Sequence, residues 1–278
     1  MPANLFGLTR PQPKRRLPKP GKGQKTVPAH RDAAKGVRGW RGGAFFFALS
    51  VALLLAVAFP SPAYMANAHY RMAKDGSVPT GKNYVLLKAG TIVVVNEKGH
   101  VLEGTLAKSQ FIASARVSLR FKEGTKIVLD GDGHLRYGTL LANETIFNGR
   151  NFFRYKAGSE VYFDQDGNLT QGTLLNDQII GANAQKCFFR GGYPVEFKYA
   201  GFIVRGVLAA DQELTNGHFS LFYQKGTEAL FDTDGNIAGG VLLYAERLYT
   251  TDGVARVFPA GTRVAYDWRG LVKKEKGG

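Results

Sequence analysis

The stretch Gly158-Ser-Glu-Val-Tyr-Phe-Asp-Gln-Asp-Gly167-Asn-Leu-Thr-Gln-Gly172-Thr-Leu174 has the pattern of a β-hairpin. Val161 and Phe163 alternate with more polar residues, and this period of two is typical of a half-buried strand. The segment Asp164-Gln-Asp-Gly167 predicts a turn, because Asp bonds to its own backbone and glycine adopts a positive φ without steric cost. Leu169 then opens a return strand.

The same pattern recurs along the chain with a period of 34 residues. An opening glycine recurs every 34 residues, except that the last spacing is 35 residues. Its positions are Gly90, Gly124, Gly158, Gly192, Gly226 and Gly261. A turn glycine nine residues later lies at Gly99, Gly133, Gly167, Gly201, Gly235 and Gly270. A third glycine, followed two residues later by leucine, lies at Gly104, Gly138, Gly172, Gly206 and Gly240. Columns that hold register in this way predict a repeat protein.

The second half of each unit adds two further columns. An apolar position that predicts another short strand is occupied by Ile112, Ile146, Ile180, Leu214 and Leu248. An aromatic position three residues before the next opening glycine is occupied by Phe121, Tyr155, Phe189, Tyr223 and Phe258. Each unit therefore carries three or four short strands, and because one unit is too small to bury its apolar face, stacking must bury a continuous strip.

We therefore expect an all-β fold: an elongated, solenoid-like array of about six antiparallel β-hairpin repeats over residues 85–272, whose incomplete terminal units act as caps. Helical repeats also have periods near 34 residues, but the many glycines and the period of two exclude them. A propeller blade usually needs about 40 residues or more, so the unit is short for a propeller.

The hairpin of residues 163–174 resembles the aromatic-x-x-x-Gly-x-x-x-x-Gly-x-Leu hairpin of MORN-type repeats, and the similarity extends over about 20 residues of each unit. MORN units are shorter than 34 residues, and the second half of each unit has no counterpart in them. The resemblance implies attachment to a membrane or a partner rather than chemistry.

The N-terminus has the features of a targeting segment. Residues 1–42 hold eleven of the 37 basic residues and one of the 22 acids, with a Pro- and Gly-rich composition typical of disorder, so the net charge of +15 is no argument for nucleic-acid binding. No Asp, Glu, Lys or Arg lies between Arg41 and Arg71, and residues 43–59 form an apolar run. Ala66-Asn67-Ala68 matches a signal peptidase site.

Residues 43–68 are therefore expected to be a signal peptide cleaved after Ala68 or, alternatively, an N-terminal signal anchor. Either alternative exports the rest of the chain to the periplasm or the extracellular space. Residues 69–84 are expected to be a linker, and residues 273–278 a basic tail.

The residues that could bind a metal or act in catalysis are better explained by roles in turns and in the core. The Asp-x-Asp-Gly turns at Asp164 and Asp232 begin like a calcium loop, but they lack the later glycine and glutamate of an EF-hand, and other units replace the acids. His100 and His134 occupy the same repeat position and are expected to be solvated rather than metal ligands. The single cysteine, Cys187, is expected to be a small buried hydrophobe. We expect no cofactor and no catalytic residue.

One column is a candidate binding site. Two residues before the opening glycine, four consecutive units carry a cation: Lys88, Lys122, Lys156 and Arg190. Such a basic ladder would contact an anionic envelope polymer, a glycan or lipid head groups; alternatively these are edge lysines that prevent aggregation of sheets.

The sequence thus predicts an exported, non-catalytic scaffold that binds a protein or an anionic polymer at the bacterial cell envelope, and no nucleic acid. The alternative is a carbohydrate- or wall-binding module that uses exposed aromatic residues, namely Tyr137, Tyr162, Tyr199, Tyr244 and Trp268. An enzyme is the least favoured class, because no residue set stands outside the repeat as a unique site. The oligomeric state is not predicted.

Overall fold

The computed structural model describes residues 67–182, 185–198 and 201–273, and these residues form an all-β fold with 24 strands that pair antiparallel. The predicted n-region 1–42, the targeting segment up to residue 66 and residues 274–278 of the tail lie outside the described residues. Within the described residues, no helix has the length and apolarity needed to span a bilayer.

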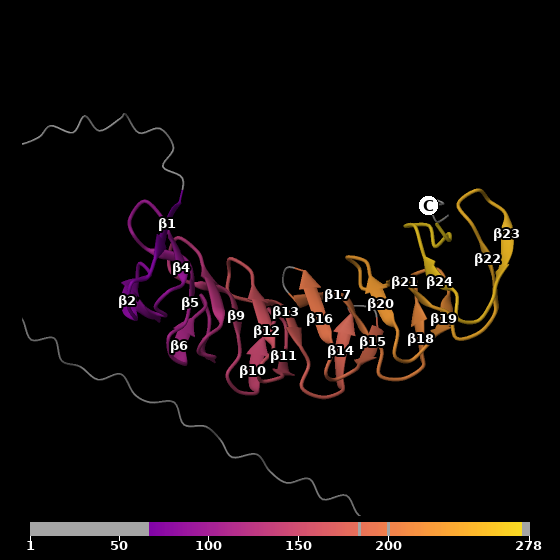
Figure 1. The fold of residues 1–278 in the computed structure, drawn as a ribbon. Coiled ribbons are helices and arrows are strands. Elements are labelled where there is room, and N and C mark those ends of the chain that lie inside the picture. The colour runs from indigo at the N-terminus through magenta and orange to yellow at the C-terminus, as the bar shows by residue number, and fades with distance from the viewer. Residues whose placement is uncertain (1–66, 183–184, 199–200, 274–278) are drawn as a thin grey trace, which may run out of the picture. The chain divides into compact units, whose positions relative to one another are not determined.

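Twelve strands form one long sheet (Figure 1). In spatial order these are β1 (Ala68–Arg71), β4 (Ile92–Val95), β5 (Val101–Thr105), β8 (Lys126–Leu129), β9 (Leu135–Thr139), β12 (Glu160–Phe163), β13 (Leu169–Thr173), β16 (Pro194–Lys198), β17 (Phe202–Val207), β20 (Glu228–Phe231), β21 (Ile237–Val241) and β24 (Arg263–Ala265). The strands of the sheet follow chain order. In each unit the chain adds one hairpin to the sheet and then forms a second hairpin outside it.

The second hairpin of each unit is a separate two-stranded sheet. The six pairs are β2 (Gly76–Pro79) with β3 (Tyr84–Leu87), β6 (Gln110–Ala113) with β7 (Ser118–Phe121), β10 (Glu144–Phe147) with β11 (Phe152–Tyr155), β14 (Gln178–Ala182) with β15 (Gln185–Phe189), β18 (Gln212–Thr215) with β19 (Ser220–Tyr223), and β22 (Glu246–Tyr249) with β23 (Ala255–Phe258). The repeated β-hairpin architecture expected from the glycine columns is thereby confirmed, with four strands in each complete unit.

The array begins earlier than residue 85. The predicted linker over residues 69–84 contains β1 and β2, and β1 pairs with β4 in the antiparallel manner of the later sheet strands. Ala68, the residue before the predicted cleavage point, pairs with Val95 and packs against the core. At the other end, Val272 bridges Tyr266 and Thr250 and so ties the last sheet strand to the last hairpin.

One hydrophobic core joins the long sheet to the hairpins, and the third glycine column explains how closely they meet. A Cβ placed on Gly138 would lie 2.6 Å from a ring carbon of Phe121, and one on Gly172 would lie 2.8 Å from Tyr155. In four units, the aromatic residue at the end of the second hairpin therefore lies directly on the glycine of the next sheet hairpin. The same contact recurs at Gly206 and Gly240.

Side-chain amides connect neighbouring hairpins to one another. The Gln178 side chain accepts from the backbone N–H of Arg154 at 2.9 Å and donates to the carbonyl of the same residue at 2.9 Å. Gln212 bonds Phe188 in the same way, and Gln110 bonds Leu86. These glutamines share one position of the 34-residue unit, so the amides supply links that backbone pairing supplies in the long sheet.

Candidate functional site

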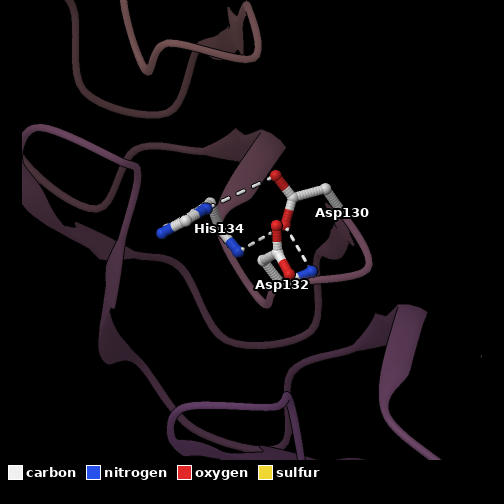
Figure 2. Close-up of side chains that lie close together, drawn as sticks. All are labelled: Asp130, Asp132 and His134. Carbon is white, nitrogen blue, oxygen red and sulfur yellow. Dashed lines mark hydrogen bonds and ion pairs between the residues drawn. The ribbon is translucent and has the colours of Figure 1, made fainter. Parts of the chain in front are cut away.

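The turn between β8 and β9 gathers the densest group of potential metal ligands in the described residues: Asp130, Asp132 and His134 (Figure 2). One ligand atom from each lies within 4.8 Å of the others. Asp130 Oδ1 accepts the backbone N–H of Asp132 at 3.0 Å and that of His134 at 2.8 Å. Its Oδ2 lies 2.6 Å from the Arg136 guanidinium and 3.5 Å from His134 Nδ1.

The carboxylate of Asp130 is therefore occupied by the turn itself. Partial burial would raise its pKa, but hydrogen bonds from the His134 and Asp132 backbone and the charge of Arg136 outweigh burial and hold the pKa below its ordinary value of 3.8. On the far side of the imidazole, Lys82 Nζ lies 2.9 Å from His134 Nε2. A cationic neighbour on each side opposes the binding of a metal cation at this group.

The other units show that this geometry belongs to the turn. Asp164 accepts from the N–H groups of Asp166 and Asn168, and Asp232 accepts from those of Asp234 and Asn236. In the first unit the neutral amide of Asn96 makes the same two bonds, to Lys98 and His100. Since a neutral side chain serves equally, the turn needs an acceptor rather than a negative charge, which agrees with the interpretation of these acids as turn residues.

The two histidines of the shared column have different surroundings. His134 joins the acidic turn, whereas His100 lies beside Gly81, and its Nδ1 is buried without a hydrogen-bond partner. Cys187 is fully buried in the core, and burial raises the pKa of its thiol to about 12. The thiol is therefore protonated at neutral pH, as a small buried hydrophobe would be.

The basic ladder lies in turns rather than in edge strands. Lys88, Lys122, Lys156 and Arg190 are exposed, and each donates its backbone N–H to the carbonyl of the last residue of a sheet strand, namely Thr105, Thr139, Thr173 and Val207. Asp75 and Asp177 cap the same row of turns through the N–H groups of Ala89 and Gly191. The row therefore carries acids among its cations, which weakens the field that a ladder of four cations would produce alone.

The aromatic candidates do not share one face. The rings of Tyr137 and Tyr162 lie 4.9 Å apart on the outward side of the long sheet. Tyr244 contacts Phe222 of a second hairpin, whereas Trp268 lies in the turn that follows β24 and is 87% exposed. Tyr199 lies outside the described residues. Any carbohydrate site would therefore use a subset of these residues.

A polar column that sequence reasoning missed holds the turns of the second hairpins. Its members are buried and share one position of the 34-residue unit: Thr80, Ser114, Asn148, Asn216 and Thr250. Asn148 Oδ1 accepts the N–H groups of Arg150 and Asn151, while its Nδ2 donates at 3.4 Å to the carbonyl of Gly201, 53 residues along the chain. The period alone would have revealed this column, but only the fold shows that it faces a distant turn.

The second hairpins also present an exposed apolar row, which we call the hairpin face. Every hairpin places at least one large apolar side chain at a position that alternates with buried ones. The members of the hairpin face are Tyr84, Phe111, Phe152, Ile179, Phe222, Tyr249 and Val257. Phe111 and Phe152 are each 68% exposed.

No protein-family model, curated protein or solved structure matches this chain. The function is therefore inferred from the chain's own residues and their arrangement.

Proposed function

We propose that the chain is an exported, non-catalytic repeat scaffold of elongated, solenoid-like form that binds an acidic partner protein at the bacterial cell envelope. The observation that carries this proposal is the hairpin face. Large apolar side chains that stay exposed on the same side of a soluble domain often mark an interaction surface. Here exposed apolar residues occur on all six hairpins, so they follow the repeat and do not arise from one chance position.

The charge of the hairpin face indicates the character of the partner. The outward positions beside the apolar residues include Arg120, Arg154 and Arg247, and no carboxylate of the described residues lies within ion-pair distance of these three. Arg120 instead stacks over the ring of Phe111, with its guanidinium 5.6 Å from the centroid. Aromatic and arginine side chains are the residues enriched at protein interfaces, and unpaired cations favour an acidic partner.

The outward side of the long sheet exposes fewer large apolar side chains, Tyr70 and Ile92 among them, and several of its charged side chains form ion pairs. Lys126 and Glu103 pair at 2.7 Å, and Arg205 lies 2.5 Å from Glu196 and 3.7 Å from Glu228. Its charges are satisfied within the sheet, so this side has less to offer a charged partner. The short strands, repeated turns and predicted export signal of the chain are consistent with the MORN-type resemblance, which favours attachment over catalysis.

Photo-crosslinking in the native host tests the proposal. A benzophenone amino acid in place of Phe152, on the hairpin face, is expected to yield a discrete protein adduct. The matched control carries the same group in place of Tyr162, which faces outward from the long sheet, and is expected to yield none. The adduct should weaken at least tenfold when Arg120 and Arg154 are changed to Glu, because the contact would then oppose an acidic surface.

Equal adducts from both positions, or an adduct unaffected by the two charge reversals, would contradict the proposal.

The same samples test whether the chain is exported, as predicted. N-terminal sequencing of the mature chain is expected to begin at His69 if the signal is cleaved, and the adduct should fractionate with the envelope. Release of the adduct with the cytoplasmic fraction would contradict export.

A further inference from the structure

We infer that the C-terminal end of the array contains a saccharide-binding site built around Trp268. A cavity of about 470 Å³ lies between three turns: the hairpin turn at Asn216–His218, the sheet turn at Asp232–Asn236, and the last sheet turn at Asp267–Trp268. This volume is within the range of about 300–1,000 Å³ that small-molecule sites occupy. None of its lining residues belongs to the hairpin face.

Trp268 supplies the apolar platform. Its side chain is 87% exposed, the largest exposed fraction among the exposed large apolar residues of the described chain. The His218 ring nitrogen lies 3.1 Å from the Trp268 backbone carbonyl, and Arg269 stacks on the indole with its guanidinium 5.7 Å from the ring. An exposed indole with a guanidinium on one face suits the C–H face of a pyranose ring, which is apolar while its rim is polar.

A buried, unpartnered amide makes the cavity more than an exposed aromatic residue. Asn216 is 7% exposed, and its Oδ1 accepts the N–H groups of His218 and Phe219. Its Nδ2 is buried and has no hydrogen-bond partner. A buried donor without a partner is unfavourable, and because Asn216 lines the cavity, a small shift of its side chain on binding would let a ligand acceptor pair with Nδ2.

Comparison with another unit shows that this donor is paired elsewhere in the repeat. At the equivalent Asn148, Nδ2 donates to the carbonyl of Gly201, 53 residues later. At Asn216 the facing turn glycine is Gly270, 54 residues later, and Nδ2 has no hydrogen-bond partner.

The other polar groups complete a set that matches sugar hydroxyls, which both donate and accept. Asn216 Nδ2 is a donor. Asp234 lines the same cavity, and Asn236 contributes its amide oxygen, because its Nδ2 donates to Asp232 at 3.3 Å. Acceptors on one turn and a donor on the next, beside an indole, fit a neutral hexose or N-acetylhexosamine unit of a polysaccharide.

Calorimetric titration of the full chain with β-1,4-linked N-acetylglucosamine tetramer and with cellotetraose tests the inference. We expect binding of at least one probe with a dissociation constant in the range of about 10 μM to 1 mM, corresponding to about −7 to −4 kcal/mol. Trp268→Ala should weaken that binding at least tenfold, whereas Tyr162→Ala, on the long sheet, should leave it unchanged.

Asn216→Asp is the sharper variant, because it keeps the oxygen that accepts from His218 and Phe219 and replaces the free donor by a second, negatively charged carboxylate oxygen. We expect it to weaken binding at least fivefold without loss of the folded state. Asn148→Asp, the matched control, should leave binding unchanged. Absence of binding to both probes at about 5 mM, a concentration above the weakest expected dissociation constant, would overturn the inference. Equal binding by wild type and Trp268→Ala would overturn it as well.

Discussion

The long sheet and the row of second hairpins are built from the same 34-residue unit, yet different hydrogen bonds connect their successive members. In the sheet, each of the twelve strands pairs with its neighbours through the backbone. The hairpins form ladders only within themselves and reach the next unit through single backbone bridges, such as that between Phe121 and Leu140, and through side chains such as Gln178. Backbone bonds do not depend on residue identity, whereas side-chain links do.

The two layers also differ in their outward residues. Outward residues of the sheet form ion pairs with one another, as Glu103 does with Lys126. Outward residues of the hairpins vary from unit to unit between aromatic, aliphatic and cationic side chains, as at Phe111, Arg154 and Ile179. The sheet is therefore the framework, and the hairpins carry the surface available for recognition. Four predictions test this distinction, from the largest expected effect to the smallest.

The contact between the two layers should be the most sensitive point. Gly172→Ala places a Cβ 2.8 Å from the Tyr155 ring and is expected to destabilise the fold by about 3 kcal/mol, because a buried ring has no free volume into which it can move. Urea unfolding measures the change. Gly181→Ala, where a Cβ has open space, is the control and should cost less than about 1 kcal/mol. Equal costs would show that the rings do not fix the layers together.

The aromatic column should respond according to the partner of each hydroxyl group. Tyr223 Oη lies 2.9 Å from Tyr266 Oη, so Tyr223→Phe removes a buried hydrogen bond and should cost about 1–2 kcal/mol. The Tyr155 hydroxyl is buried without a partner, so Tyr155→Phe should leave stability unchanged or raise it by about 1 kcal/mol. Thermal unfolding distinguishes the two, and a loss of stability at Tyr223 without one at Tyr155 is the expected result.

The side-chain links between hairpins should be separable from the sheet. Gln178→Glu replaces an amide donor by an acceptor opposite the Arg154 carbonyl and should cost about 1 kcal/mol. Glu144 occupies the same repeat position, so Glu144→Gln should stabilise by a similar amount. Hydrogen exchange should change first in the affected hairpin, while the amides of β12 and β13 stay protected. If the amides of the sheet lost protection from exchange together with those of the hairpin, the side-chain links would not be separable from the sheet.

The turns of the sheet should depend weakly on pH, because they are capped by a carboxylate, whereas the hairpin turn at Asn148 is capped by a neutral amide. Hydrogen bonds and Arg136 depress the pKa of Asp130, so its contribution to stability is present above pH 3.8 and is lost as the pH falls through the folded-state pKa. Asp130→Asn keeps both backbone hydrogen bonds but loses the ion pair with Arg136, so it should be less stable than wild type at pH 7, and the difference should shrink as the pH falls towards about 2. If the difference in stability between wild type and Asp130→Asn stayed constant over this pH range, the carboxylate of Asp130 would not be the group responsible.

Much of the fold could be predicted because its determinants are local. The alternation around Val161 and the turn at Asp164–Gly167 fix a hairpin within about 15 residues, and periodicity extends it along the chain. The candidate sites were harder to predict for a physical reason. The ladder of Lys88 and its equivalents was found as a column, but the acids that share its row, such as Asp75, come from a different part of the unit.

The sequence by itself determined the hairpin, its period and the positions of the turns, because these depend on contacts between residues close in the chain. Only the tertiary structure decided why the third column is glycine, since the ring that excludes a Cβ at Gly172 belongs to Tyr155 of the preceding hairpin. It also decided that Asn216 and Trp268, 52 residues apart, line one cavity. Such contacts depend on how the units stack, which the local pattern of one unit does not determine.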